Sequence, residues 1–169
     1  MVKLTIDGIQ VEAEKGTSIL HAAESVGIEV PTLCYIKDLL PDGSCRMCMV
    51  EIESRGRTKM ETACTAQVAE GLVVTTNSEK VRNARRNILD MLLSNHKTDC
   101  FSCPSNGDCK LQELCFEYGI ERTTYSGEQT ELPIDDSNKF FTYNPNLCIL
   151  CHRCVNTCHK VVGRGAIDT

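Results

Sequence analysis

The chain contains a dense run of soft metal ligands between residues 96 and 109, with the sequence H-K-T-D-C-F-S-C-P-S-N-G-D-C. The ligands have the spacing His-x3-Cys-x2-Cys-x5-Cys and are His96, Cys100, Cys103 and Cys109. A histidine alone at the end of a helix would more often be a capping residue. Three cysteines within the next thirteen residues reverse that expectation and favour a metal site.

A second group of cysteines lies upstream, with the spacing Cys34-x10-Cys45-x2-Cys48-x15-Cys64. Three thiols from one loop and a fourth from a later strand follow the general plan of a 2Fe–2S ferredoxin. The first gap of ten residues is longer than the gap in plant-type ferredoxins. Zinc is the alternative, but structural zinc sites normally pair two C-x2-C-like units and Cys64 stands alone. The sequence therefore predicts a 2Fe–2S cluster here.

A third group lies downstream, with the spacing Cys148-x2-Cys151-x2-Cys154-x3-Cys158. This is the bacterial ferredoxin run for 4Fe–4S clusters, in which the first three cysteines bind one cluster and the fourth reaches another. His159 replaces the usual proline, and no second run follows. We expect the chain to be a fragment of a longer polypeptide. The alternative is that the remaining ligand is not a cysteine of this chain.

The remaining cysteine and histidines are expected to lie outside the ligand sets. Cys115 is four residues after Leu111 on one face of a predicted helix, so we interpret it as a small buried apolar residue. His21 has no cysteine group near it in sequence and is expected at the surface or its boundary. His152 and His159 are interpreted as surface groups beside the thiols rather than ligands.

Composition bounds the compartment and the partners. The chain has 169 residues, 12 cysteines, no Trp and 5% aromatic residues, and small cores of this kind need staples, which metal clusters can supply. A disulfide framework is the alternative, but the N-terminus has no apolar signal segment, so we expect a cytoplasmic location and reduced thiols. The net charge of −5 argues against a nucleic-acid partner. No apolar run approaches transmembrane length.

Apolar periodicity predicts the elements that carry the first cysteine group. Residues 2–6 and 9–11 alternate apolar and polar side chains around Asp7-Gly8, which predicts a hairpin. Thr17 or Ser18 is expected to cap a short helix that Gly27 stops. Further strands are expected at residues 49–53, 60–65 and 72–76. The predicted fold class is α+β, of β-grasp type.

Two helices are expected to carry the histidine–cysteine run. Residues 78–95 have apolar side chains at steps of three and four, and residues 110–118 form a second helix that Asp108 is expected to cap. The predicted domains are therefore a 2Fe–2S ferredoxin-like β-grasp domain (1–78), a small helical His/Cys 4Fe–4S domain (79–120), a polar connecting segment (121–143) and a partial 4Fe–4S ferredoxin-like domain (144–169).

The order of these motifs resembles one family closely over essentially the whole chain. It is the N-terminal iron–sulfur module of the complex I large iron–sulfur subunit, the iron-only hydrogenases and the catalytic subunits of NAD(P)-linked formate dehydrogenases. The segments P-T-L-C (31–34), C-R-M-C (45–48), C-K-L-Q (109–112) and C-I-L-C (148–151) carry the resemblance. It implies that a 2Fe–2S cluster is held by Cys34, Cys45, Cys48 and Cys64, a 4Fe–4S cluster by His96, Cys100, Cys103 and Cys109, a second 4Fe–4S cluster by Cys148, Cys151 and Cys154, and a further one in part by Cys158.

The resemblance also implies an electron conduit. The sequence has no nucleotide-binding glycine motif and no nucleophile–base pair, so no catalytic residue is predicted. In the family, electrons pass between flavin- and NAD(P)-binding iron–sulfur subunits, or a ferredoxin, and a catalytic domain. The segment G-R-G-A-I-D (163–168) and the cysteine after L-Q-E-L favour formate dehydrogenase as the parent enzyme. The alternatives are an iron-only hydrogenase, a complex I-type NADH dehydrogenase and, from another class, a zinc-stapled interaction module.

Overall fold

The computed structural model describes residues 1–126 and 131–168, whose contacts group them into two units. Unit 1 joins Met1–Arg85 to His152–Thr169, and unit 2 is Arg86–Cys151. The four-part division by cluster type that the sequence suggests stays a prediction, because contacts between residues do not test which cluster each segment binds.

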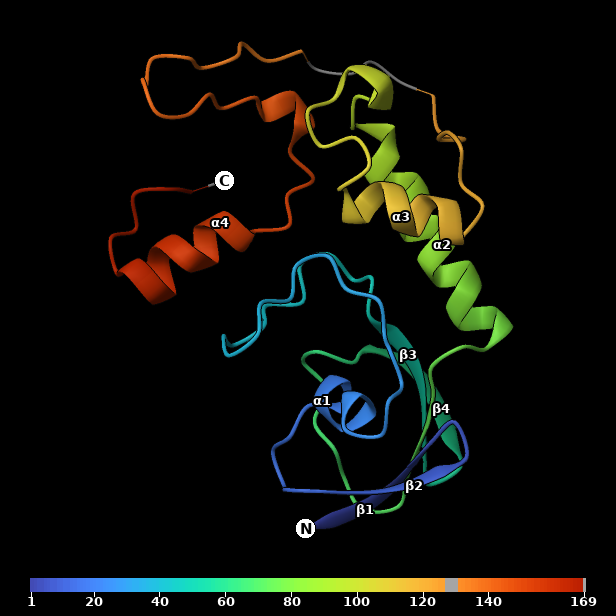
Figure 1. The fold of residues 1–169 in the computed structure, drawn as a ribbon. Coiled ribbons are helices and arrows are strands. Elements are labelled where there is room, and N and C mark those ends of the chain that lie inside the picture. The colour runs from blue at the N-terminus through green and yellow to red at the C-terminus, as the bar shows by residue number, and fades with distance from the viewer. Residues whose placement is uncertain (127–130, 169) are drawn as a thin grey trace. The chain divides into compact units, whose positions relative to one another are not determined.

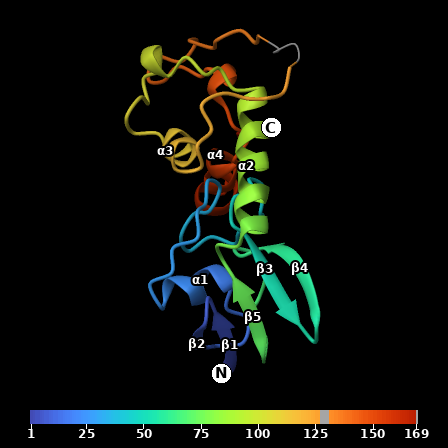
Figure 2. The same cartoon turned by 90° about the vertical axis from the view of Figure 1, so that its right-hand side faces the viewer.

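Unit 1 contains a five-stranded sheet (Figures 1 and 2). The strands are β1 (Val2–Ile6), β2 (Ile9–Ala13), β3 (Met49–Ser54), β4 (Arg57–Thr62) and β5 (Leu72–Thr75), in the spatial order β2-β1-β5-β3-β4. β1 pairs in parallel with β5, and the other neighbours are antiparallel. Alternate residues of β1, β2, β3 and β5 are buried, as a sheet with one covered face requires.

The predicted first hairpin is confirmed. Ile6 pairs with Ile9, and the two turn residues Asp7 and Gly8 have φ values of 47° and 84°. Positive φ at both central positions defines the primed turn whose twist matches that of the strands. The Asp7 carboxylate also accepts a hydrogen bond from the Thr76 backbone N–H at 2.8 Å, which ties the turn to the end of β5.

Helix α1 (Ile19–Glu24) covers the sheet (Figure 1). Ser18 is its N-cap, as expected, and accepts from the His21 backbone N–H at 3.2 Å. The core beneath the helix is apolar and includes the fully buried Leu4, Ile6, Ile19, Leu20, Val50 and Val74. A hairpin, a helix and further strands around one core confirm the predicted α+β fold.

Two sequence predictions about strand and helix ends are wrong. β4 spans Arg57–Thr62, whereas residues 60–65 were predicted. It begins early because Arg55 and Gly56, at φ 51° and 72°, form a tight turn after β3. Cys64 therefore lies in the turn after β4, whereas the sequence placed it in the strand. The N-cap of helix α3 is Cys109, not Asp108, and no side-chain hydrogen bond caps that end.

Helix α2 (Glu79–Ser94) begins where predicted, with Ser78 accepting from the Val81 backbone N–H at 3.2 Å. Within unit 2, its second half is bonded to the segment that follows α3 (Lys110–Glu117). The Arg86 guanidinium donates to the Tyr118 carbonyl, and the Asp90 carboxylate accepts from the Thr123 hydroxyl at 2.8 Å. These bonds fix both helices around the histidine–cysteine run that connects them.

Shorter elements carry the remaining cysteines. They are the 3-10 helices Cys100–Ser102 and Pro145–Leu147, the helix α4 (Arg153–Asn156) and a π-helical turn at Thr157–Val162. The described part of the connecting segment is largely exposed and contains one isolated bridge, between Asp135 and Tyr143. Among the described residues, no helix has both the length and the apolar character needed to cross a membrane.

Candidate iron–sulfur centres

The structure brings the four upstream cysteines together in unit 1. Cys34, Cys45, Cys48 and Cys64 are all buried, with exposed fractions between 1% and 7%. The first three come from the loop before β3 and the fourth from the turn after β4. The Ala63 backbone N–H donates to the Cys48 carbonyl at 2.9 Å, which holds the turn beside the loop. Sheet pairing thus determines where the fourth thiol lies.

The four thiols are arranged as two pairs. A side-chain hydrogen bond joins Cys34 to Cys45, raises the pKa of Cys34 and lowers that of Cys45 to about 6. In the same way, a hydrogen bond between Cys48 and Cys64 lowers the pKa of Cys48 and raises that of Cys64. In each pair the sulfur that accepts the hydrogen bond, Cys45 or Cys48, is the more readily deprotonated one, and the thiolate is the form that binds metal.

Two thiol pairs fit a cluster with two irons, because each tetrahedral iron needs two cysteines beside the two bridging sulfides. The Met47 backbone N–H also donates toward the Cys45 sulfur and lowers its pKa. The arrangement therefore favours a cluster over the zinc staple.

Three of the four predicted ligands in the histidine–cysteine run line a cavity of about 780 Å³ in unit 2. It lies between the end of α2, the 3-10 helix Cys100–Ser102 and α3, and its lining includes His96, Cys100 and Cys109. Apolar side chains such as Leu93 and Leu111 complete the wall. Each ligand of a 4Fe–4S cluster binds a different iron, so these ligands need to surround a cavity rather than meet at one point.

His96 shows most directly that this cavity suits a metal cluster. Its Nδ1 atom is buried and has no hydrogen-bond partner among the described residues. Such an orphaned polar atom costs about 1–3 kcal/mol, and a bond to a metal would remove that cost. Burial lowers the pKa of His96, so the imidazole is neutral at pH 7, which is the state that ligates metal.

The lining of the cavity includes Cys115, which is not a predicted ligand, and lacks Cys103, which is one. Cys103 directly follows the 3-10 helix and is half-buried, but it is not among the residues that line the cavity. Cys115 is buried on the same face of α3 as Leu111, as predicted, and it does line the cavity. Burial raises the pKa of Cys115 to about 11, so it stays a protonated thiol.

We expect Cys115→Ala to leave the iron content of the chain unchanged, because Cys115 packs beside Leu111 on α3 and lies outside the four proposed ligands of the neighbouring cluster. The expected cost is about 1 kcal/mol of unfolding free energy for the small cavity left behind. Iron analysis and thermal unfolding of the variant measure both quantities. Loss of an electron-paramagnetic-resonance signal on this substitution would instead make Cys115 a ligand.

The downstream cysteines are divided between the two units. Cys148 and Cys151 belong to unit 2, and Cys154 and Cys158 belong to unit 1. Cys148 accepts from the Leu150 backbone N–H at 3.4 Å, and Cys158 from the Ala166 backbone N–H at 3.2 Å. Cys154 and Cys158 line one hollow of about 470 Å³. N–H donors on sulfur stabilise thiolate ligands, which suits a cluster-binding run.

The three histidines outside the run make polar contacts with other parts of the chain. His21 is exposed, as expected, and its Nε2 is 2.5 Å from the Tyr35 hydroxyl oxygen. His159 Nε2 lies 3.0 Å from the Ile167 carbonyl oxygen. His152 lies near Ser44 and Asp42 in unit 1, a contact that sequence reasoning did not predict.

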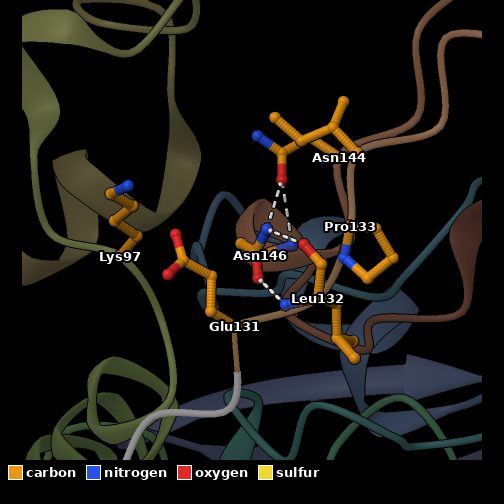
Figure 3. A pocket seen from close by; sticks show the side chains of 7 residues that line it. Lys97, Glu131, Leu132, Pro133, Asn144 and Asn146 are labelled. Carbon is orange, nitrogen blue, oxygen red and sulfur yellow. Dashed lines mark hydrogen bonds between the residues drawn. The ribbon is translucent and has the colours of Figure 1, made fainter.

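Another hollow in unit 2, of about 470 Å³, lies beside Lys97, Glu131 and Pro133 (Figure 3). Asn146 donates to the Leu132 carbonyl and accepts from the Leu132 backbone N–H, both at 2.8 Å, and Asn144 Oδ1 accepts from Asn146. The polar amides shown in Figure 3 therefore hold two chain segments together. Among the described residues, no cysteine or histidine lines this hollow, so it is separate from the cluster sites.

These features define an iron–sulfur protein of the electron-transfer class. Residues 1–79 match the family model described as "2Fe-2S iron-sulfur cluster binding domain". Residues 85–124 match the "NADH-ubiquinone oxidoreductase-G iron-sulfur binding region". The chain therefore binds both 2Fe–2S and 4Fe–4S clusters, as predicted.

Relatives of known identity match nearly the whole chain. The alpha chain of the NADPH-Fe(3+) oxidoreductase of Geobacter sulfurreducens is 42% identical over 99% of this chain and 20% of its own length. The NADP-reducing hydrogenase subunit HndD of Solidesulfovibrio fructosivorans is 37% identical over 99% of this chain and 29% of its own. The mitochondrial NADH-ubiquinone oxidoreductase 78 kDa subunit of Candida albicans is 37% identical over 99% of this chain and 23% of its own. The chain thus spans between a fifth and a third of these curated relatives.

A solved structure gives the same result. A chain of an NAD+-reducing [NiFe]-hydrogenase, crystallised in the H2-reduced state, superimposes with a TM-score of 0.89 and 31% identity over 99% of this chain and 69% of that chain. The chain belongs to the family of iron–sulfur modules that NADH dehydrogenase large subunits and NAD(P)-linked hydrogenases share, and the resemblance seen in the sequence is confirmed.

Proposed function

We propose that the chain relays single electrons inside a multi-cluster oxidoreductase, between flavin- and NAD(P)-binding iron–sulfur subunits and a catalytic domain or subunit. The observation that carries this proposal is the pairing of four buried thiols in unit 1, together with the histidine–cysteine cavity in unit 2. The clusters, when bound, supply one-electron oxidation and reduction. The chain's own residues hold the clusters and tune their potentials.

We propose the ligand sets that the sequence suggested. Cys34, Cys45, Cys48 and Cys64 would hold the 2Fe–2S cluster, and burial of all four supports this set. His96, Cys100, Cys103 and Cys109 would hold a 4Fe–4S cluster, and three of these four residues line one cavity. The second 4Fe–4S cluster would use Cys148, Cys151 and Cys154, and a further one would use Cys158.

The surroundings of the thiols suit this role. Met47, between Cys45 and Cys48, is fully buried, and a Cβ atom added at Gly43 would lie only 3.3 Å from Thr65 Cγ2. An apolar, closely packed shell excludes water from a cluster and so affects its potential. In unit 2, a neutral imidazole in place of a thiolate leaves one less negative charge on the cluster, which raises its potential.

The parent enzyme is the finer part of the proposal. The sequence of segment 163–168 favours a formate dehydrogenase. The similarity to hydrogenase subunits over 99% of the chain supports a hydrogenase as the second candidate. The polypeptide that carries this chain should reduce NAD(P)+ with formate in the first case and with H2 in the second. If the polypeptide reduced a quinone with NADH but used neither formate nor H2, the complex I-type alternative would be favoured.

We expect about ten irons per chain after anaerobic reconstitution, from one 2Fe–2S and two 4Fe–4S clusters, because the further cluster has a single proposed ligand here, Cys158, and should not assemble on it alone. Iron and acid-labile sulfide analysis measure this directly, with zinc determined in the same sample as the control. Only two irons per chain would contradict the relay. A colourless protein that contains zinc and no sulfide would support the zinc-stapled interaction module instead.

A further inference from the structure

Within unit 1, the loop that precedes Cys45 is bonded to the segment that carries Cys154 and Cys158. These two parts are more than a hundred residues apart in sequence. Neither belongs to the sheet, and the loop between Cys34 and Cys45 has no regular secondary structure. Its position therefore depends on the individual side-chain contacts that it makes.

Asp42 is at the centre of these contacts. Its Oδ2 atom accepts from the Asn156 side-chain amide at 2.9 Å and lies 3.6 Å from His152 Nδ1. Its Oδ1 atom accepts from the Ser44 backbone N–H at 3.4 Å. One carboxylate thus contacts its own loop with one oxygen and the distant segment with the other.

Two further contacts bound the same interface. Ser44 Oγ is 3.4 Å from His152 Nδ1, and the Lys160 ammonium donates to the Leu40 carbonyl at 2.8 Å. The contacts thus run along the loop from Leu40 to Ser44, directly before Cys45. Although burial acts to raise it, the hydrogen bonds from Asn156 and Ser44 hold the pKa of Asp42 at about 2. The carboxylate is therefore ionised at neutral pH.

The first part of the loop also approaches the cysteines of the α4 segment. Ile36, two residues after Cys34, lines the same hollow as Cys154 and Cys158. The loop thus reaches the hollow near one end and is bonded to the α4 segment near the other. Since electronic coupling between two centres falls steeply with their separation, a loosened loop would weaken the coupling between the centres that these cysteines hold.

We propose that Asp42 is a positioning residue. It holds the loop between Cys34 and Cys45 against the α4 segment, and so sets the electronic coupling between the 2Fe–2S centre and the centre that Cys154 would help to hold. This inference rests on the proposed electron relay. The step would be the transfer of one electron from the 2Fe–2S centre, which would lose it, to the 4Fe–4S centre that Cys154 would help to hold, which would gain it. No bond is formed or broken and no proton moves.

The test compares wild type with Asp42→Ala, Asn156→Ala and the double variant. Glu53→Ala is the matched control, because Glu53 is an exposed acid of the same unit, near the far end of β3. The variants are purified anaerobically with their clusters. Iron content and the 2Fe–2S midpoint potential are measured first, and both should match wild type. The magnetic interaction between the reduced centres and the rate of electron equilibration between them are then measured.

We expect both single variants to lower the equilibration rate severalfold and to weaken the magnetic interaction, with faster hydrogen exchange in residues 36–44. The double variant should lose no more than Asp42→Ala alone, because Asn156→Ala removes a contact that Asp42→Ala already breaks. Variants with wild-type rate and interaction would overturn the role of Asp42 alone. A wild-type chain without any interaction between the two centres would overturn the proposed relay as well.

Discussion

Replacement of His96 by alanine is expected to remove about four irons from the reconstituted chain, whereas replacement by cysteine should keep them. Two observations support this expectation. The Nδ1 atom of His96 is buried without a hydrogen-bond partner among the described residues, and His96 lines a cavity with Cys100 and Cys109. Cysteine at this position supplies a thiolate and adds one negative charge. Extra negative charge stabilises the oxidised cluster, so His96→Cys should lower its reduction potential.

A redox titration with iron analysis of both variants checks this expectation. The alternative role for His96 is structural, since its backbone N–H donates to the Leu93 carbonyl at 3.2 Å, at the end of α2. If His96 only closed that helix, both variants would keep full iron content and an unchanged midpoint. Cys115→Ala is the control for a change in the same cavity without loss of a ligand.

The local parts of the fold were predictable because they depend on neighbours in sequence. The Asp7-Gly8 turn, the Ser18 and Ser78 caps and the register of the first hairpin follow from short-range hydrogen bonds. The parallel pairing of β1 with β5 joins residues about seventy positions apart, and no local pattern encodes it. The turn at Arg55 was missed because a non-glycine residue adopts a positive φ there.

The candidate site was likewise predictable only where it depends on the spacing of residues in the sequence. Spacing indicated which cysteines group together, and burial of Cys34, Cys45, Cys48 and Cys64 agrees with their grouping. Spacing did not indicate that Cys115 faces the histidine–cysteine cavity, because core and cavity positions share one helical period. The contacts of Asp42 with Asn156 and His152 were also beyond prediction, since exposed polar side chains give no periodic signal.

The cysteine of the β4 turn allows a sharp test of the 2Fe–2S assignment. Cys64→Ala is expected to remove about two irons and the 2Fe–2S signal, while the histidine-ligated cluster in unit 2 remains. Cys64 contacts Cys48 and is 2% exposed, so its loss breaks one of the two thiol pairs. Cys115→Ala is the matched control, because it also removes a buried thiol but leaves every proposed ligand in place.

The same substitution should also destabilise unit 1. Cys34, Cys45 and Cys48 lie in a loop that has no strand pairing of its own, and a bound cluster would add metal–sulfur links to the backbone hydrogen bond that joins this loop to the turn after β4. Loss of a metal centre is among the changes that cost most, on the order of 3 kcal/mol or more. Thermal unfolding should therefore separate Cys64→Ala from Cys115→Ala clearly. Equal iron content and equal stability in the two variants would remove Cys64 from the cluster and leave the thiol pair with Cys48 as packing alone.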